Sequence, residues 1–280
     1  MNVEIQQRVF IVGAPRSGTT LLQSFLASHP RIQSFPETHF FSAAFPRLCI
    51  KRMLTWSALN VRGVLKRFLH EINRPDLIEE YGHINLLEHN YANTLIRLLD
   101  HLTLEAGKDI WVEKTPRHIF FVEEISNRVP KAKFIHIIRH GADVVASLYE
   151  VTNRDFFKWR KGKQHLFAKG LSIDKCIKRW NDAVQITAKW YRCSNHLLVK
   201  YEQLVKSPPE ELDKICNFLE INYSPLMERG ERSFDEIVTL EEKWKANNMK
   251  PVQEMDRKFF RIFSEEEQKY ILGKLHKINF

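Results

Sequence analysis

Two glycines near the amino end, Gly13 and Gly18, enclose a loop that carries one cation, Arg16. A glycine loop that runs into the first turn of a helix binds anions, because its free backbone N–H groups and the positive end of the helix dipole point the same way. Further donors at this turn come from Ser17, Gly18, Thr19 and Thr20. We therefore predict a site for a terminal phosphate group. The alternative is a tight strand-to-helix turn that is glycine-rich for structural reasons alone.

The loop lacks the lysine that loops for nucleoside triphosphates place directly after the second glycine. Thr19 stands at that position, and the cation lies inside the loop at Arg16. In a triphosphate loop the lysine reaches the β and γ phosphates. A nucleotide kinase or another NTPase is therefore disfavoured, but it stays an alternative that would require magnesium-dependent ATP turnover.

A second anion-binding pattern follows an apolar segment later in the chain. Residues 134–138 run directly into Arg139, and Ser147 comes eight residues later on a helix predicted to begin near Asp143. An arginine at the end of a strand and a hydroxyl in the next helix can converge on one anion at the edge of an open α/β sheet. The alternative is that Arg139 pairs with Asp143 as an ordinary ion pair.

The elements that must position these residues alternate between strands and helices. Short apolar runs predict strands at 9–12, 110–112, 134–138 and 197–200, and a short extended segment is expected at 32–35. Helical spacing marks 21–28, 75–104 and 173–191. This alternation predicts an α/β fold, a P-loop-like three-layer fold with a central parallel sheet and helices on both faces. We expect a single domain over 1–280, with a helical cap insertion at about 40–105. Ser207 and Glu210 predict a capping box.

Composition limits the class of protein. The 280 residues are 44% hydrophobic and 28% charged, as in soluble globular proteins, and the net charge of +9 favours an anionic ligand or surface. A non-catalytic binder of polyanions is thus a third alternative. The four cysteines have no metal-ligand spacing, and no apolar run is long enough for a transmembrane segment. We expect a cytoplasmic protein that holds no metal.

Several segments together resemble a known family. FIVGAPRSGTT followed by FIHIIRHGADVVASLY is similar to the sulfotransferases, which use 3′-phosphoadenosine-5′-phosphosulfate (PAPS) as donor and release 3′,5′-ADP (PAP). EKTP, KYEQLVKSP and MKPV resemble the tyrosylprotein-sulfotransferase-like branch of that family. The resemblance implies a PAPS-dependent enzyme of the EC 2.8.2 class.

The resemblance also implies which residues bind the donor. Arg16 would contact its bridging oxygen, and Ser17, Gly18, Thr19 and Thr20 its 5′-phosphate. The 3′-phosphate would be bound by Arg139 and Ser147. Tyr201, Lys250 and Lys258 would contact the nucleotide from later segments. One departure is Val151, which stands where the branch has another phosphate-binding arginine, and Arg154 is a candidate substitute.

The same resemblance implies the catalytic residues. Glu37 matches the general base of the branch, and Lys114 matches a lysine that stabilises the transferring group together with Arg16. His39 is the rival base. Glu113 is expected to orient Lys114 through a salt bridge. The acceptor is expected to carry a hydroxyl or an amine on a small molecule, sugar, lipid or protein, and no nucleic acid partner is expected.

Overall fold

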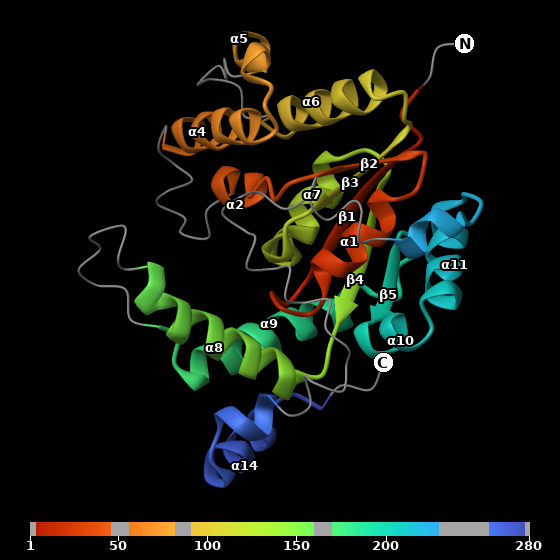
Figure 1. Cartoon of the computed structure of the whole chain (residues 1–280). Helices are drawn as coiled ribbons and strands as arrows, with labels where there is room; N and C mark the ends of the chain where they lie inside the picture. Colours follow the sequence, from red (N-terminus) through yellow and green to blue (C-terminus); the bar gives the residue numbers. More distant parts are fainter. Residues whose placement is uncertain (1–3, 46–55, 82–90, 160–169, 230–257, 278–280) are drawn as a thin grey trace.

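The structure, a computed structural model, describes residues 4–45, 56–81, 91–159, 170–229 and 258–277. Within them a parallel sheet has the strand order β2-β3-β1-β4-β5 (Figure 1). The strands are β1 (Gln7–Gly13), β2 (Ile32–Phe35), β3 (Ile110–Lys114), β4 (Ala132–Ile138) and β5 (His196–Lys200). All strand pairs are parallel, so the carboxyl ends of the five strands lie at one edge of the sheet.

The sheet is buried on both faces, as continuous apolar strands require. Alternate residues of β1 point to opposite sides: Phe10 packs in one hydrophobic cluster, whereas Val9 and Ile11 pack in another. On β3, Trp111 belongs to the first cluster and Val112 to the second. The core is therefore divided in two by the sheet.

Helices cover both faces. The cluster around Val9 is closed by α1 (Thr19–Ala27), α10 (Tyr201–Lys206), α11 (Pro208–Leu219) and the 3₁₀ helix η3 (Pro225–Arg229). The cluster around Phe10 is closed by α2 (Phe40–Ala44), α4 (Trp56–Glu71), α6 (Tyr91–Glu105), α7 (Val122–Arg128), α8 (Gly141–Trp159) and α9 (Ile173–Trp190). Figure 1 shows the sheet between these two layers, with α1 and α11 on one side of the strands and α2 and α7 on the other. The predicted three-layer α/β fold is confirmed.

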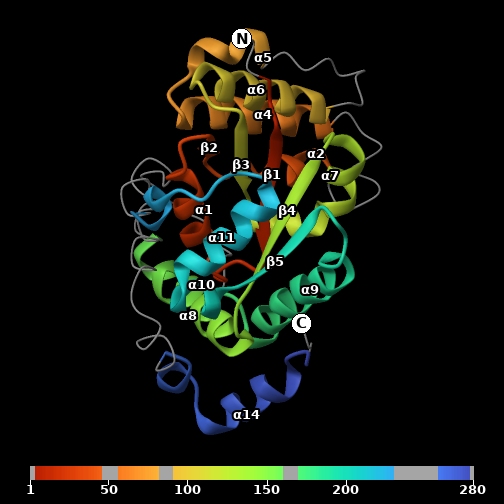
Figure 2. The same cartoon turned by 90° about the vertical axis from the view of Figure 1, so that its right-hand side faces the viewer.

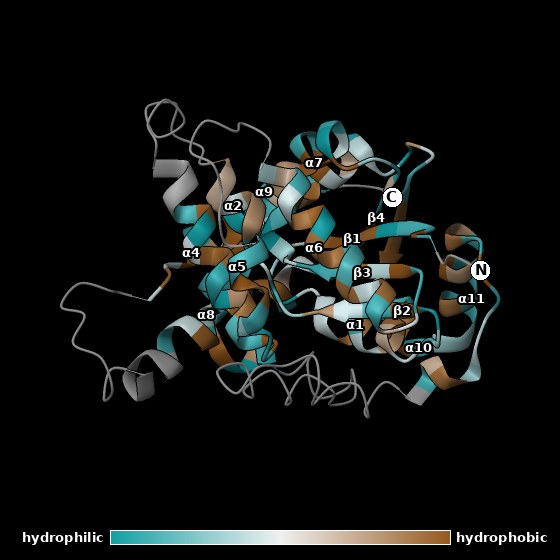
Figure 3. Ribbon diagram, turned by 90° about the horizontal axis from the view of Figure 1, so that it is seen from above, coloured by the Kyte–Doolittle hydropathy of each residue, from teal (hydrophilic) through white to brown (hydrophobic). Residues whose placement is uncertain are grey.

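The stretch between β2 and β3 is helical in its described part. It contains α2, α4, α6, the short η1 (Pro75–Leu77) and α5 (Ile78–Tyr81). The helices α4, α5 and α6 gather at one end of the molecule, and α14 (Glu265–Lys274) lies at the other end beside α9 (Figures 1 and 2). In Figure 3 the helices alternate between hydrophobic and hydrophilic stretches, as helices with one buried side do.

The element boundaries differ from the sequence expectation in informative places. Helix α1 begins at Thr19, two residues earlier than predicted, so the hydroxyls of Thr19 and Thr20 lie in its first turn. The predicted capping box at Ser207 is wrong: its side chain makes no capping hydrogen bond, and its N–H bonds to the Gln203 carbonyl. Ser207 occupies both the C-cap position of α10 and the N-cap position of α11. Its backbone therefore continues the hydrogen bonding of α10, and its side chain does not cap α11. A capping box is present instead at Ser264, at the start of α14.

Two buried histidines join β4 to β5. His136 Nε2 lies 2.8 Å from His196 Nδ1, and His136 Nδ1 lies 3.1 Å from Thr187 Oγ1 on α9. The His196 ring stacks between Phe134 and Trp190. Burial lowers the pKa of His136 to about 3 and that of His196 to about 4. Both rings are therefore neutral at physiological pH.

This pair predicts acid sensitivity of folding. The unfolded histidines bind protons near their ordinary pKa of about 6.5, but the folded ones do not, so the stabilisation is fully present above pH 6.5 and is lost as the pH falls toward 4. The unfolding free energy of the wild type should fall between pH 7 and 5. In His196→Phe, which keeps the stacking, we expect this slope to be smaller by a value approaching about 1.4 kcal/mol per pH unit. Urea unfolding at several pH values measures it, with His70→Gln, exposed on α4, as the control. A wild-type slope in His196→Phe would contradict the assignment.

Candidate functional site

The loop after β1 has a backbone that only particular residues allow. A Cβ on Gly13 would lie 2.4 Å from the Ile137 carbonyl oxygen, so glycine is needed where the chain passes β4. Arg16 adopts a left-handed φ of 77°, an uncommon conformation for a residue with a side chain. Such strain typically marks a functional position, because the surrounding structure must compensate a cost of about 1–3 kcal/mol.

Tyr201 packs against the second glycine of the loop. A Cβ on Gly18 would lie 2.3 Å from the Tyr201 ring, and Gly18 itself has a φ of 93°. The guanidinium carbon of Arg139 lies 4.5 Å from the centre of the same ring. The tyrosine at the start of α10 therefore joins the loop after β1 to the arginine after β4.

The start of α1 has the features of an anion site. No side chain caps its first turn, so the backbone N–H groups there are not satisfied by a cap. The Ser17 hydroxyl is fully buried and has no hydrogen-bond partner among the described residues. An uncapped helix end beside a buried, unsatisfied hydroxyl fits a phosphate group, which accepts several hydrogen bonds at once.

The two predicted anion-binding elements meet. Arg16 Nε donates to Ser147 Oγ at 3.0 Å, although the residues are 131 positions apart. Arg139 and Ser147 are both 7% exposed. Arg139 Nη2 also lies 3.8 Å from Asp143, the alternative partner that the sequence suggested. The loop after β1 and the β4–α8 segment thus form one continuous basic site.

Trp180 supports this site from α9. Its Nε1 donates to the Arg139 carbonyl at 3.0 Å, and a Cβ on Gly141 would lie 3.0 Å from its ring. Trp180 is buried and packs in the same hydrophobic cluster as Phe10. Its indole N–H shows that it also fixes the backbone of the arginine.

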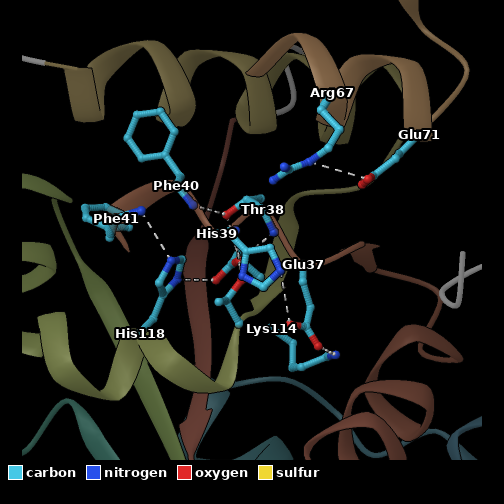
Figure 4. Close-up of polar contacts among 11 residues, drawn as sticks. Glu37, Thr38, His39, Phe40, Phe41, Arg67, Glu71, Lys114 and His118 are labelled. Atoms are coloured by element: carbon cyan, nitrogen blue, oxygen red, sulfur yellow. Dashed lines mark hydrogen bonds and ion pairs between the residues drawn. The ribbon is translucent and has the colours of Figure 1, made fainter. Parts of the chain in front are cut away.

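At the neighbouring strand ends, a carboxylate meets a buried lysine. Lys114, the last residue of β3, is 2% exposed, and its Nζ lies 2.6 Å from Glu37 Oε1 (Figure 4). Glu37 follows β2, and its side chain is 13% exposed. The side chain of Glu37 therefore has solvent access, while the cation that neutralises it is buried. Glu37 and Lys114, two separate candidates from the sequence, are brought together by the adjacent parallel strands β2 and β3.

His39 lies next to the same carboxylate. Its Nε2 is 3.6 Å from Glu37 Oε2, and its side chain is 45% exposed. Burial lowers the pKa of His39 more than the attraction of Glu37 raises it. Arg67 on α4 adds a smaller contribution in the same direction as burial, and Figure 4 shows it near His39.

The predicted salt bridge from Glu113 to Lys114 is wrong. Consecutive strand residues point to opposite faces, and Glu113 lies with Trp111 on the side away from Lys114. It is fully buried and binds Thr38, Thr115 and His118. Sequence reasoning missed Thr38 and His118. The alternation of side chains along a strand could have shown that Glu113 and Lys114 point to opposite faces of the sheet.

The later candidates are placed only in part. Lys250 lies outside the described residues, as does the side chain of Arg154. Lys258 forms an ion pair with Glu150, which lies one helical turn after Ser147 on α8. Lys258 therefore reaches the helix that carries Ser147.

Two kinds of feature do not occur in the described ranges. They contain no group of three or more His, Cys, Asp or Glu residues suited to a metal ion. In the same part of the chain no helix combines the length and the apolar character needed to cross a membrane.

Comparison with known proteins connects this geometry to one family. The sequence model of the sulfotransferase family matches residues 8–225. The chain is 26% identical over 243 residues to protein-tyrosine sulfotransferase A of Caenorhabditis elegans, covering 83% of this chain and 54% of that protein. It is 29% identical over 216 residues to the nodulation protein NoeE of Sinorhizobium fredii, covering 74% of this chain and 48% of that protein. The chain thus spans about half the length of these relatives.

Solved structures share the fold. The sulfotransferase domain of the Synechococcus PCC 7002 olefin synthase has a TM-score of 0.56 and 20% identity, covering 96% of this chain and 94% of that one. Mouse sulfotransferase SULT7A1, solved in complex with PAP, has a TM-score of 0.52 and 12% identity, covering 98% and 85%. At these identities the likeness establishes the fold.

The contact between Gly18 and Tyr201 generates a prediction. Gly18→Ala should lower the unfolding free energy by about 1–3 kcal/mol, because the methyl group meets the ring and the φ angle disfavours a side chain. Gly63→Ala is the matched control: a Cβ added at Gly63, in α4, would meet nothing within 4 Å, and the change should stabilise by about 0.5–1 kcal/mol. Urea unfolding of both variants measures this. Equal effects would contradict the packing argument.

Proposed function

This chain belongs to the sulfotransferase family, and on that basis we propose that it is a PAPS-dependent sulfotransferase of the EC 2.8.2 class. The proposal depends chiefly on the Arg16–Ser147 hydrogen bond, which makes one site of the two anion-binding segments. A nucleotide with phosphates at both its 5′ and 3′ positions requires two such segments side by side. A kinase has no corresponding support, since Thr19 occupies the place of its lysine.

The donor fits the residues present. Ser17 offers a buried hydroxyl without a partner in the described part of the chain, and the uncapped first turn of α1 supplies N–H groups for the 5′-phosphate. Arg139 and Ser147 supply a charge and a hydroxyl for the 3′-phosphate. The mouse protein of the same fold was solved with PAP, and we propose the same nucleotide here. Tyr201 would border it.

Glu37, Lys114 and Arg16 are the proposed catalytic residues. In an in-line transfer, the acceptor oxygen or nitrogen forms a bond to sulfur as the bond from sulfur to the bridging oxygen of the donor breaks. The acceptor proton passes to Glu37, which acts as general base. Lys114 and Arg16 offset the negative charge that develops on the transferring group and on the leaving phosphate oxygen. 3′,5′-ADP leaves with the bonding electrons.

The acceptor would bind among the loops around Glu37. Several relatives are named protein-tyrosine sulfotransferases, so a phenolic hydroxyl, on a peptide or on a small molecule, is the first acceptor to test. Acceptor pockets vary within one fold, and sugars, lipids and amines belong in the same screen.

Donor binding is tested with two charge deletions. Arg16→Ala and Arg139→Ala should each weaken 3′,5′-ADP binding by about 10–100-fold, because each removes a charged hydrogen bond to a phosphate. Isothermal titration calorimetry measures the affinity. Arg31→Ala is the matched control, since Arg31 pairs with Asp109 near the amino ends of β2 and β3. Wild-type affinity in both site variants would refute the donor site.

Proton transfer is tested at Glu37. Glu37→Gln should bind 3′,5′-ADP as the wild type does and lose about 100-fold or more in transfer rate, because an amide accepts no proton. Transfer of ³⁵S from labelled PAPS to a panel of phenols, tyrosine peptides, sugars and amines measures the rate. His39→Gln is the comparison. Loss of transfer in His39→Gln with full transfer in Glu37→Gln would assign the base to His39.

A further inference from the structure

Glu113 is a completely buried carboxylate directly before the proposed catalytic lysine. Its Oε1 accepts hydrogen bonds from the backbone N–H of Thr38 at 3.2 Å, from the Thr38 hydroxyl at 2.9 Å and from the Thr115 hydroxyl. Its Oε2 lies 2.9 Å from His118 Nδ1. Burial alone would raise the pKa of Glu113, but His118 and these hydrogen bonds outweigh it and lower the pKa below its ordinary value. The carboxylate is therefore ionised, and both of its oxygens are hydrogen-bonded.

His118 completes this network in one tautomer. Its Nε2 accepts from the Phe41 backbone N–H at 3.3 Å, so its proton lies on Nδ1 and is donated to Glu113 (Figure 4). The His118 ring is fully buried and meets Phe41 edge-on. Histidine is thus the donor that Glu113 needs and the acceptor that the start of α2 needs.

The network fixes the backbone that follows Glu37, one amide after another. Glu113 holds the N–H of Thr38, Thr115 Oγ1 accepts from the N–H of His39 at 3.3 Å, and Thr38 Oγ1 accepts from the N–H of Phe40 at 3.3 Å. His39 has a left-handed φ of 53°. These bonds offset the cost of that conformation and leave this short segment few alternative arrangements.

Two consecutive residues of one segment contact two consecutive residues of β3. Glu37 contacts Lys114, and Thr38 contacts Glu113. Because Glu113 and Lys114 point to opposite faces of the sheet, the segment is attached on both sides of the end of β3. A shift of Thr38 would therefore move Glu37 relative to Lys114.

We propose that Glu113 and His118 are positioning residues, which hold the Glu37 carboxylate in its place beside Lys114 through Thr38. The inference depends on the proposed function, in which Glu37 is the base. It adds a buried second carboxylate that takes no proton from the acceptor and touches neither donor nor acceptor. Its contribution is to limit the motion of Glu37, and misplacement of a reacting group by about 1 Å can cost about 100-fold in rate.

The test uses two substitutions of Thr38. Thr38→Val keeps the shape and β-branching but removes the hydroxyl, whereas Thr38→Ser keeps the hydroxyl. We expect Thr38→Val to lower kcat for ³⁵S transfer about 10–100-fold with unchanged 3′,5′-ADP affinity, and Thr38→Ser to stay within about threefold of the wild type. A purely structural role would lower the melting temperature of Thr38→Val and leave kcat per folded molecule unchanged, which would overturn the proposal.

A second measurement needs no acceptor. In crystal structures of the two variants with 3′,5′-ADP, we expect the Glu37–Lys114 contact to be lost or divided among rotamers in Thr38→Val and to be kept in Thr38→Ser. An intact contact in Thr38→Val would overturn the proposal. This result is independent of whether Glu37 is the base, whereas full transfer in Glu37→Gln would overturn the assignment of Glu37 as general base and leave the geometric result to stand by itself.

Discussion

The hydrogen bond from Arg16 to Ser147 connects two anion-binding segments that lie far apart along the chain. A parallel sheet makes this contact possible, because β1 and β4 are neighbours and both end at the same edge. Gly13 lets β1 pass the Ile137 carbonyl at that edge. Tyr201, which directly follows β5, packs on Gly18. The identity of the ligand, and every role assigned around it, depends on these loops forming one site.

In the neighbouring half of the site, three charged side chains lie close together and are shielded from solvent. Two carboxylates and a lysine lie within two residues of the ends of β2 and β3, and all are largely buried. The strand separates them: Lys114 neutralises Glu37 on one face, while Glu113 is satisfied by hydroxyls, an amide and His118 on the other. Buried charges persist only when they are paired or hydrogen-bonded in this way. The Glu37 carboxylate therefore retains solvent access, whereas the Glu113 carboxylate is fully buried and hydrogen-bonded to Thr38, Thr115 and His118.

The sequence predicted the parts of the structure that depend on local pattern. Buried parallel strands are short apolar runs, so four of the five were predicted as strands, with β1 extending to Gln7 and Gly13, and β2 was expected as a short extended segment. The loop residues were recognised because glycines and an arginine at fixed spacing have few other uses. The contact of Arg16 with Ser147 spans 131 positions and required the fold. Glu113 was paired with its neighbour Lys114, although consecutive residues of a strand point to opposite faces. Ser207 was assigned to the start of a helix, although its backbone N–H still bonds to the Gln203 carbonyl at the end of α10.

The most direct measurement is a crystal structure of this protein with 3′,5′-ADP. We expect one nucleotide whose 5′-phosphate contacts the backbone N–H groups at Gly18–Thr20 and the Ser17 hydroxyl, and whose 3′-phosphate contacts Arg139 and Ser147. A nucleotide that occupies only one of these segments, or that binds elsewhere on the sheet edge, would contradict it.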